Sequence, residues 1–210
     1  MTNFDLIVDT SRKGISMALC ADAVYEEIVD PSGKGEVLSA SLDSLLAKVG
    51  ATLDDVKRVM VTVGPGSFSG LRTGVAFCQG LCFSGKRKLY GVTTLQALAC
   101  FAGTADESVA VVIRARNGFW YLRLNGEESF IETADVVARL KASSVKNAVI
   151  DAAALADEAL VTVFKDKGIA TTLDTDKPLS MWATLFETVK PSLIQEANYI
   201  QPSYFEKLKV

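Results

Sequence analysis

The sequence predicts an α/β protein composed of two similar halves, and three observations support this prediction. Short apolar runs alternate along the chain with longer segments of helical period. In each half, strands come first and helices then alternate with strands, which indicates a duplicated α/β unit. Small and polar residues at 103–106 interrupt the pattern near the middle. We therefore predict two subdomains, residues 1–104 and residues 105–210.

The first half is expected to begin with three antiparallel strands. The apolar run "FDLIVDT" is the first, and two further runs follow it at hairpin spacing. Leu38, Leu42, Leu45 and Val49 then recur at helical spacing, and Gly50 ends this amphipathic helix. The expected elements of this half are strands at 4–10, 14–20, 23–29, 56–63 and 88–92 and helices at 35–49, 70–85 and 94–101.

The second half repeats part of this order. Strands are expected at 109–114, 119–124 and 147–151, and helices at 133–141 and 178–190. The two halves share the order of their elements but show no sequence identity, so the expected duplication rests on pattern alone.

Composition describes an ordinary globular chain without a general attraction for polyanions. The 210 residues are 49% hydrophobic and 22% charged, and the net charge of -3 argues against nucleic-acid binding by this chain alone. The absence of histidine excludes Ser-His-Asp hydrolysis and HExxH zinc chemistry. The four cysteines form no CxxC pair, and we expect no metal site. The chain start lacks a basic, cleavable leader and no apolar run has membrane-spanning length, so we expect a cytoplasmic protein without membrane contact.

The stretch "VTVGPGSFSGLRTG" places a glycine-rich loop between an expected strand and an expected helix. The free N–H groups at such a helix start can bind a phosphate, but the loop can equally be a tight structural turn. The loop lacks the lysine of GxxxxGK[ST] and does not match GxGxxG, so both interpretations stay open. The residues that would form a nucleotide or phosphate loop are Asp9, Thr10, Gly64, Gly66, Ser67 and Gly70.

Asp9 stands at the end of the first expected strand and has two candidate roles. Its carboxylate could hold Mg²⁺ through water, or it could cap the turn that follows the strand. We favour the cap, because an aspartate before a turn commonly accepts hydrogen bonds from the next backbone N–H groups.

Three motifs resemble the bacterial TsaB (YeaZ) family over roughly the first hundred residues. These are "VDTSRKGISMAL", "GPGSFSGLRTGVAFCQGL" and "LYGVTTLQALA", which occur in the family's order and spacing. Members of that family are the non-catalytic partners of the TsaD subunit in making threonylcarbamoyladenosine at adenosine 37 of tRNA. The resemblance implies the ASKHA fold of actin, Hsp70 and sugar kinases, with two RNase H-like βββαβα halves.

The resemblance also implies partners and cofactors. It implies a TsaD-like catalytic subunit, a TsaE-like ATPase, tRNA as a partner only within the complex, and a homodimer when the chain is alone. It implies no cofactor on this chain, with ATP or ADP and metal held by the partner subunits. Two departures lie in the second half: Arg114 in "RARNGFWY" replaces the acid of the family's "DARxGEVY", and Gln201 replaces an arginine near the C-terminus.

The expected helix at 70–85 is apolar nearly all round, with a stripe of small residues at helical spacing. Close approach of another helix would account for glycine inside it, whereas a fully buried helix within one domain is the alternative; we favour the interface. The expected partner-binding residues are Leu38, Ser41, Leu45, Arg72, Thr73, Ala76, Phe77 and Gly80. The leading interpretation is thus a scaffold subunit. A free-standing ATP-dependent phosphotransferase or glycoprotease-like enzyme is the alternative.

Overall fold

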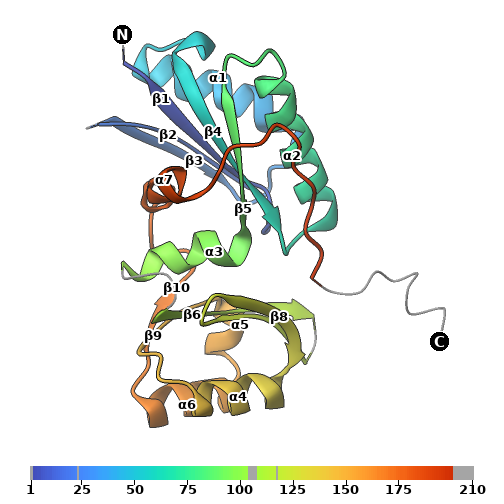
Figure 1. The fold of residues 1–210 in the computed structure, drawn as a ribbon, viewed down its shortest axis with the longest axis vertical. Helices are drawn as coiled ribbons and strands as arrows, with labels where there is room; N and C mark the ends of the chain where they lie inside the picture. The colour runs from blue at the N-terminus through green and yellow to red at the C-terminus, as the bar shows by residue number, and fades with distance from the viewer. Residues whose placement is uncertain (1, 23, 104–107, 117, 201–210) are drawn as a thin grey trace, which may run out of the picture. The chain divides into compact units, whose positions relative to one another are not determined.

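The computed structural model describes residues 2–22, 24–103, 108–116 and 118–200 and contains two five-stranded sheets (Figure 1). The strand order is β3-β2-β1-β4-β5 in the first sheet and β10-β9-β6-β7-β8 in the second. The strands are β1 (Phe4–Asp9), β2 (Ile15–Ala21), β3 (Val24–Asp30), β4 (Val56–Gly64), β5 (Lys88–Thr93), β6 (Val109–Arg116), β7 (Phe119–Leu124), β8 (Glu127–Glu132), β9 (Asn147–Ile150) and β10 (Ala170–Leu173).

The two sheets have the same topology. In the first, β1 pairs antiparallel with β2 and parallel with β4, and β4 pairs parallel with β5. In the second, β6 pairs antiparallel with β7 and parallel with β9, and β9 pairs parallel with β10. Each half therefore has three antiparallel strands followed by two parallel ones. This confirms the duplicated α/β unit predicted from the order of the elements.

Two helices cover one face of the first sheet. Helix α1 (Leu38–Val49) buries four leucines at 38, 42, 45 and 46 and ends at Gly50, which has a left-handed φ of 66°. Helix α2 (Phe68–Cys82) contributes Val75, Cys78 and Cys82 to the same hydrophobic cluster. A 3₁₀ helix, η1 (Gly35–Val37), precedes α1, so the α-helical part starts at Leu38 and not at residue 35. The first-half helices and strands thus form where the periodicity places them, with shifted ends.

The chain divides into two compact units that do not follow the chain in one block. Met1–Thr94 and Pro178–Asn198 form unit 1, and Leu95–Lys177 belongs to unit 2. The first break therefore follows Thr94 and not residue 104, and the chain returns to unit 1 after Lys177. Two backbone hydrogen bonds hold the returning segment: the Ser192 N–H donates to the Leu89 carbonyl and the Asn198 N–H to the Val63 carbonyl. Most of the expected break at 103–106, and Gln201, lie outside the described residues.

The segment that returns to unit 1 starts with two short helices in place of the expected helix at 178–190. These are the 3₁₀ helix η5 (Leu179–Thr184) and α7 (Leu185–Thr188), which lie beside the first sheet (Figure 1). Among the described residues, no helix is both long enough and apolar enough to span a bilayer.

Unit 2 contains three elements that sequence patterns did not reveal. They are the edge strands β8 and β10 and helix α6 (Glu158–Lys167). Helix α6 packs beside α4 (Thr133–Ala142), and both contribute to one hydrophobic cluster with Trp120 and Leu122 of β7. Short helices lie in the connections between elements of both units: η2 (Leu53–Asp55), α3 (Thr94–Ala99), η3 (Cys100–Ala102) and α5 (Ala152–Leu155).

Candidate functional site

The turn after β1 is built around the buried carboxylate of Asp9. One oxygen, Oδ1, accepts hydrogen bonds from the Ser11 N–H at 2.9 Å, the Ser11 hydroxyl at 2.6 Å and the Thr62 hydroxyl at 2.8 Å. The other oxygen, Oδ2, lies 3.0 Å from Nε of Arg12. The bond to the Ser11 N–H is the turn cap that the sequence predicted for Asp9.

The same contacts keep Asp9 ionised. Burial alone would raise the pKa of its carboxyl group, but the positive charge of Arg12 and the hydrogen bonds from Ser11 and Thr62 bring the pKa below its ordinary value of 3.8. A carboxylate whose two oxygens already accept four bonds is poorly suited to proton transfer. The arrangement is that of a structural anchor.

The glycine loop packs directly on this turn. The Ser67 N–H donates to the Ser11 carbonyl at 2.6 Å. A Cβ at Gly66 would overlap the Ser11 carbonyl, and one at Gly70 would overlap the Thr10 carbonyl. The glycines therefore permit close approach of two backbone segments, which is a structural reason for their presence.

Gly64 and Gly74 extend the same explanation beyond the loop. Gly64 has a φ of 117°, and a Cβ there would overlap the Asn198 carbonyl. A Cβ at Gly74, inside α2, would overlap the Thr10 hydroxyl. Thr10 Oγ1 is itself buried and has no hydrogen-bond partner among the described residues. The side of α2 that faces the turn is thus tightly packed.

These contacts bring together five of the six residues of the expected phosphate loop, whereas Gly64 packs against the Asn198 carbonyl, and two of the loop N–H donors are already used. The Ser67 N–H is used by Ser11, and the Gly70 N–H donates to the Ser67 hydroxyl, which caps α2. The residues present therefore fit a tight structural turn better than a phosphate site. Within the described ranges, no group of three or more His, Cys, Asp or Glu side chains could hold a metal ion.

The opposite side of α2 is open to solvent. Arg72, Thr73, Ala76 and Gly80 are exposed, and no atom lies within 4 Å of where a Gly80 Cβ would stand. Phe68 and Phe83, near the two ends of the helix, are 56% and 82% exposed. The guanidinium carbon of Arg72 lies 4.1 Å from the centre of the Phe68 ring. We call this surface of Phe68, Arg72, Thr73, Ala76, Gly80 and Phe83 the α2 surface.

The prediction of partner-binding residues is wrong for Leu38 and Leu45. Leu38 is 1% exposed and Leu45 is fully buried, because both point into the core of unit 1 and not outward. Ser41 is partly exposed, and Phe77 is partly buried against the same core. The 3₁₀ helix η1, which precedes α1, lies against the α2 surface, because a Cβ at Gly35 would overlap the Thr73 methyl group.

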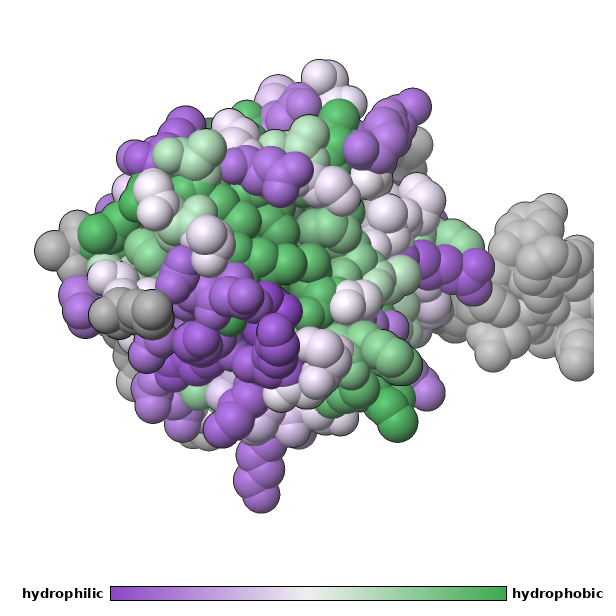
Figure 2. Space-filling view, turned by 90° about the horizontal axis from the view of Figure 1, so that it is seen from above, coloured by the Kyte–Doolittle hydropathy of each residue, from purple (hydrophilic) through white to green (hydrophobic). Residues whose placement is uncertain are grey.

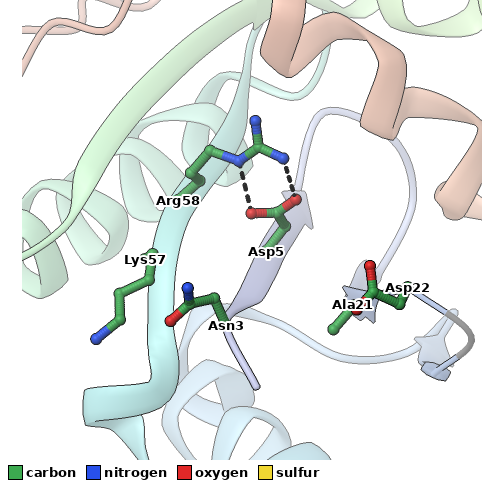
Figure 3. Close-up of a pocket in the computed structure, with 6 residues that line it drawn as sticks. All are labelled: Asn3, Asp5, Ala21, Asp22, Lys57 and Arg58. Atoms are coloured by element: carbon green, nitrogen blue, oxygen red, sulfur yellow. Dashed lines mark hydrogen bonds and ion pairs between the residues drawn. The ribbon is translucent and has the colours of Figure 1, made fainter. Parts of the chain in front are cut away.

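A pocket of about 420 Å³ lies where β1 and β4 begin, lined by Asn3, Asp5, Ala21, Asp22, Lys57 and Arg58 (Figure 3). Arg58 donates to both oxygens of Asp5, at 2.7 and 2.6 Å, and to Glu187 of α7 at 2.6 Å. Its guanidinium carbon is also 4.6 Å from the centre of the Phe186 ring. Arg58 therefore joins the returning segment to the first sheet and is not available to a ligand.

The end of unit 1 at which β1 begins also carries hydrophobic side chains (Figure 1 and Figure 2). Seen from above, they gather in the middle of that face, next to a block of hydrophilic side chains (Figure 2). The charged pocket residues come from the same end of unit 1, because they belong to the starts of β1 and β4 and to the end of β2. Of the charged side chains that line the pocket, Asp5 and Arg58 are paired with each other.

Replacing Arg58 by methionine should lower the stability of unit 1. The substitution keeps the aliphatic contact but removes the bidentate pair with Asp5 and the bond to Glu187, and we expect a loss of about 1–3 kcal/mol. Glu187 is largely exposed and should contribute little of this loss. Urea unfolding of Arg58→Met measures it, with Lys57→Met as the matched control. Equal stability of the two variants would contradict the role of Arg58.

Three further side chains that could meet a nucleic acid are buried. Trp120 is fully buried and donates from its indole N–H to the Thr133 hydroxyl, and Tyr121 is 5% exposed, so neither is open to a base. Arg87 belongs to a run of three basic residues that is typical of a solvated turn, but it is buried and donates to the carbonyls of Leu53 and Leu81. Nothing in the local sequence indicates these two acceptors.

The fold shows the structural class of the protein, and the comparison with known families then shows the family. The two five-stranded sheets of equal topology, with helices between their strands, form an ASKHA-like fold. A model of the family described as "TsaD: tRNA N6-adenosine threonylcarbamoyltransferase" matches residues 35–178, and the chain belongs to this family. Within the family it is similar to TsaB (YeaZ) proteins, as the sequence motifs predicted, and over a shorter stretch to a TsaD-type protein.

Two curated relatives are named tRNA threonylcarbamoyladenosine biosynthesis protein TsaB. The one from Escherichia coli (strain K12) is 29% identical over 120 residues, which cover 55% of this chain and 52% of the relative. The one from Bacillus subtilis (strain 168) is 30% identical over 122 residues, covering 57% and 53%. The chain thus spans about half the length of the curated relatives it matches.

A solved structure from Pseudomonas aeruginosa, described as similar to peptidase YEAZ, covers 95% of this chain and 100% of its own. Its TM-score is 0.69 at 22% sequence identity, which shows that the two chains share a fold.

Proposed function

We propose that this chain is a scaffold subunit that supports a TsaD-like catalytic subunit in forming threonylcarbamoyladenosine in tRNA. The observation that carries the proposal is the α2 surface, where a helix that is packed on one side exposes small residues and two phenylalanines on the other. Small exposed residues let a second helix approach closely, and exposed aromatic rings contribute strongly to protein interfaces.

The proposal includes the other members of the assembly. A TsaE-like ATPase docks on the catalytic subunit, ATP or ADP and metal are held by these partners, and tRNA is contacted within the complex in the cytoplasm. Without its partner the chain pairs with itself through the α2 surface. A TsaD-type protein of Clostridium botulinum (strain Hall) supports the link to the catalytic subunit, because it is 36% identical over 61 residues, 29% of this chain and 18% of that protein.

The experiment is a comparison of the purified chain with and without a TsaD-like protein. The chain alone should show neither ATP hydrolysis nor peptidase activity, whereas the two proteins should co-purify and modify tRNA when the ATPase is added. The absence of histidine and the fully bonded Asp9 carboxylate are the reasons for expecting no activity from the chain alone. Turnover by the isolated chain would support the free-standing enzyme instead.

Asp9→Asn should leave reconstituted tRNA modification largely intact. The amide keeps the size of the side chain and loses the ion pair with Arg12, so we expect a stability loss on the order of 1 kcal/mol and turnover within a few-fold of the unmodified chain. Thermal melting and single-turnover modification assays measure the two effects. A thousandfold loss of turnover in an intact complex would show that Asp9 takes part in chemistry.

The pH dependence of stability follows from the lowered pKa of Asp9. The folded state binds the proton more weakly than the unfolded state, so the ionised carboxylate stabilises the fold above its ordinary pKa of 3.8, and this contribution disappears as the pH falls through the folded pKa. The stability difference between the wild type and Asp9→Asn should therefore be constant above about pH 5 and shrink towards pH 3. Urea unfolding at several pH values measures it, and a difference that grows on acidification would contradict the assignment.

A further inference from the structure

The β6–β7 hairpin of unit 2 is positively charged, although the whole chain carries a net charge of -3. Residues 109–124 include Arg114, Arg116 and Arg123 and no aspartate or glutamate. Arg123 is buried, and its Nε lies 3.9 Å from the Glu128 carboxylate. Arg114 and Arg116 have no carboxylate partner for their side chains within the described part of the chain.

Arg116 is exposed and lies over two aromatic rings. Its guanidinium carbon is 4.6 Å from the centre of the Phe119 ring and 5.1 Å from that of Phe130. The two rings are stacked, with centres 4.9 Å apart and planes 7° from parallel, and the Tyr121 ring is 5.8 Å from Phe130. Cation–π contacts of this kind restrict an arginine side chain without neutralising its charge.

Phe119 and Phe130 are each partly exposed. Trp120 and Leu122 belong to the cluster that α4 and α6 cover, and successive side chains of a strand point to opposite faces. Phe119 therefore lies on the other face of the second sheet. The residue paired with Phe119 across the strands is Glu132, whose side chain is exposed to solvent.

A register shift in β6 separates the two arginines. The pairing of β6 with β7 is irregular between Arg114 and Arg116, and such irregularities change the direction of side chains. The guanidinium carbon of Arg114 lies 4.4 Å from the Trp120 ring centre, and its Nε is buried without an acceptor among the described residues. The backbone N–H of Arg114 donates to the Asp151 carboxylate, which also caps α5. Arg116 is therefore the arginine that can meet a ligand from solvent.

We propose that Arg116, Phe119 and Phe130 form a contact surface for single-stranded RNA, with Arg116 on a phosphate and a phenylalanine ring against a base. The inference rests on the proposed function, which supplies an RNA substrate, and it assigns part of the RNA contact to this chain. An acidic protein segment would use only the guanidinium. A nucleotide has both an anionic phosphate and a flat base, and this surface offers the guanidinium group for the phosphate and a phenylalanine ring for the base.

The test is fluorescence anisotropy of a short, labelled single-stranded RNA with the purified full chain at low salt. Arg116→Glu should weaken binding by roughly tenfold or more, and Phe130→Leu, which keeps an apolar side chain but removes the ring, should weaken it several-fold. Arg139→Glu is the matched control, because Arg139 is an exposed arginine of α4, which covers the opposite face of the second sheet. It should change binding by less than about twofold.

Three results would contradict the proposed RNA contact surface. These are equal losses in Arg116→Glu and Arg139→Glu, unchanged binding in Phe130→Leu, and displacement of the RNA by a glutamate-rich peptide as effectively as by unlabelled RNA. The last result would favour an acidic protein partner. Co-purification with the TsaD-like protein separates this proposal from the proposed function: Arg116→Glu should leave it unchanged, and a wild-type chain that binds RNA but no partner would refute only the scaffold role.

Discussion

Gly66→Val should unfold unit 1 or prevent α2 from packing on the first sheet. A Cβ at Gly66 would overlap the Ser11 carbonyl, and that carbonyl is fixed by its hydrogen bond from Ser67. Neither backbone segment can retreat without disturbing the Asp9 cap on one side or the start of α2 on the other. We expect a loss on the order of 3 kcal/mol or more, a large fraction of the stability of a typical domain.

Thermal melting of Gly66→Val, with Gly80→Val as the matched control, measures this loss. Gly80 is also a glycine of the motif region, but its Cβ position is open, so its replacement by valine should leave the melting temperature nearly unchanged. If Gly66→Val melts like the control and still binds its partner, the close packing of the loop on the turn is not what requires glycine there.

The first-half architecture was predictable because its signals are local. The leucine spacing of α1, the C-terminal Gly50 and the apolar run of β4 each require only neighbouring residues to be recognised. The glycine loop was also recognised, but its role was not, since only the structure shows that the Ser11 and Thr10 carbonyls occupy the space beside it.

Features that depend on distant contacts were missed. Strand β8, "EESFIE", has glutamates at three of six positions and forms because it pairs with β7 at the sheet edge. The return of Pro178–Asn198 to unit 1 depends on carbonyls of Leu89 and Val63, which no local pattern indicates. Likewise, helical spacing identified the apolar face of α1 but not what covers it, which is why Leu38 was assigned to a partner and not to the core.

Ala76→Arg and Gly80→Arg should weaken self-association and binding to the TsaD-like subunit together. Both positions are exposed on the α2 surface, on a stripe of small residues that allows helix axes to approach to about 8 Å. An arginine placed there would have to be desolvated without a partner in a packed contact, at a cost of about 2–4 kcal/mol. One surface cannot serve two neighbours at once, so the homodimer and the heterodimer should compete.

Sedimentation velocity and a pull-down with the TsaD-like protein measure the two associations. Ala138→Arg is the matched control, because Ala138 is exposed on α4 of unit 2 and the same substitution there should leave both associations unchanged. All three variants should keep the wild-type melting temperature within a few degrees, since none of the replaced side chains lies in a core cluster. Folded Ala76→Arg and Gly80→Arg variants that still dimerise and still bind the catalytic subunit would refute the assignment of the α2 surface.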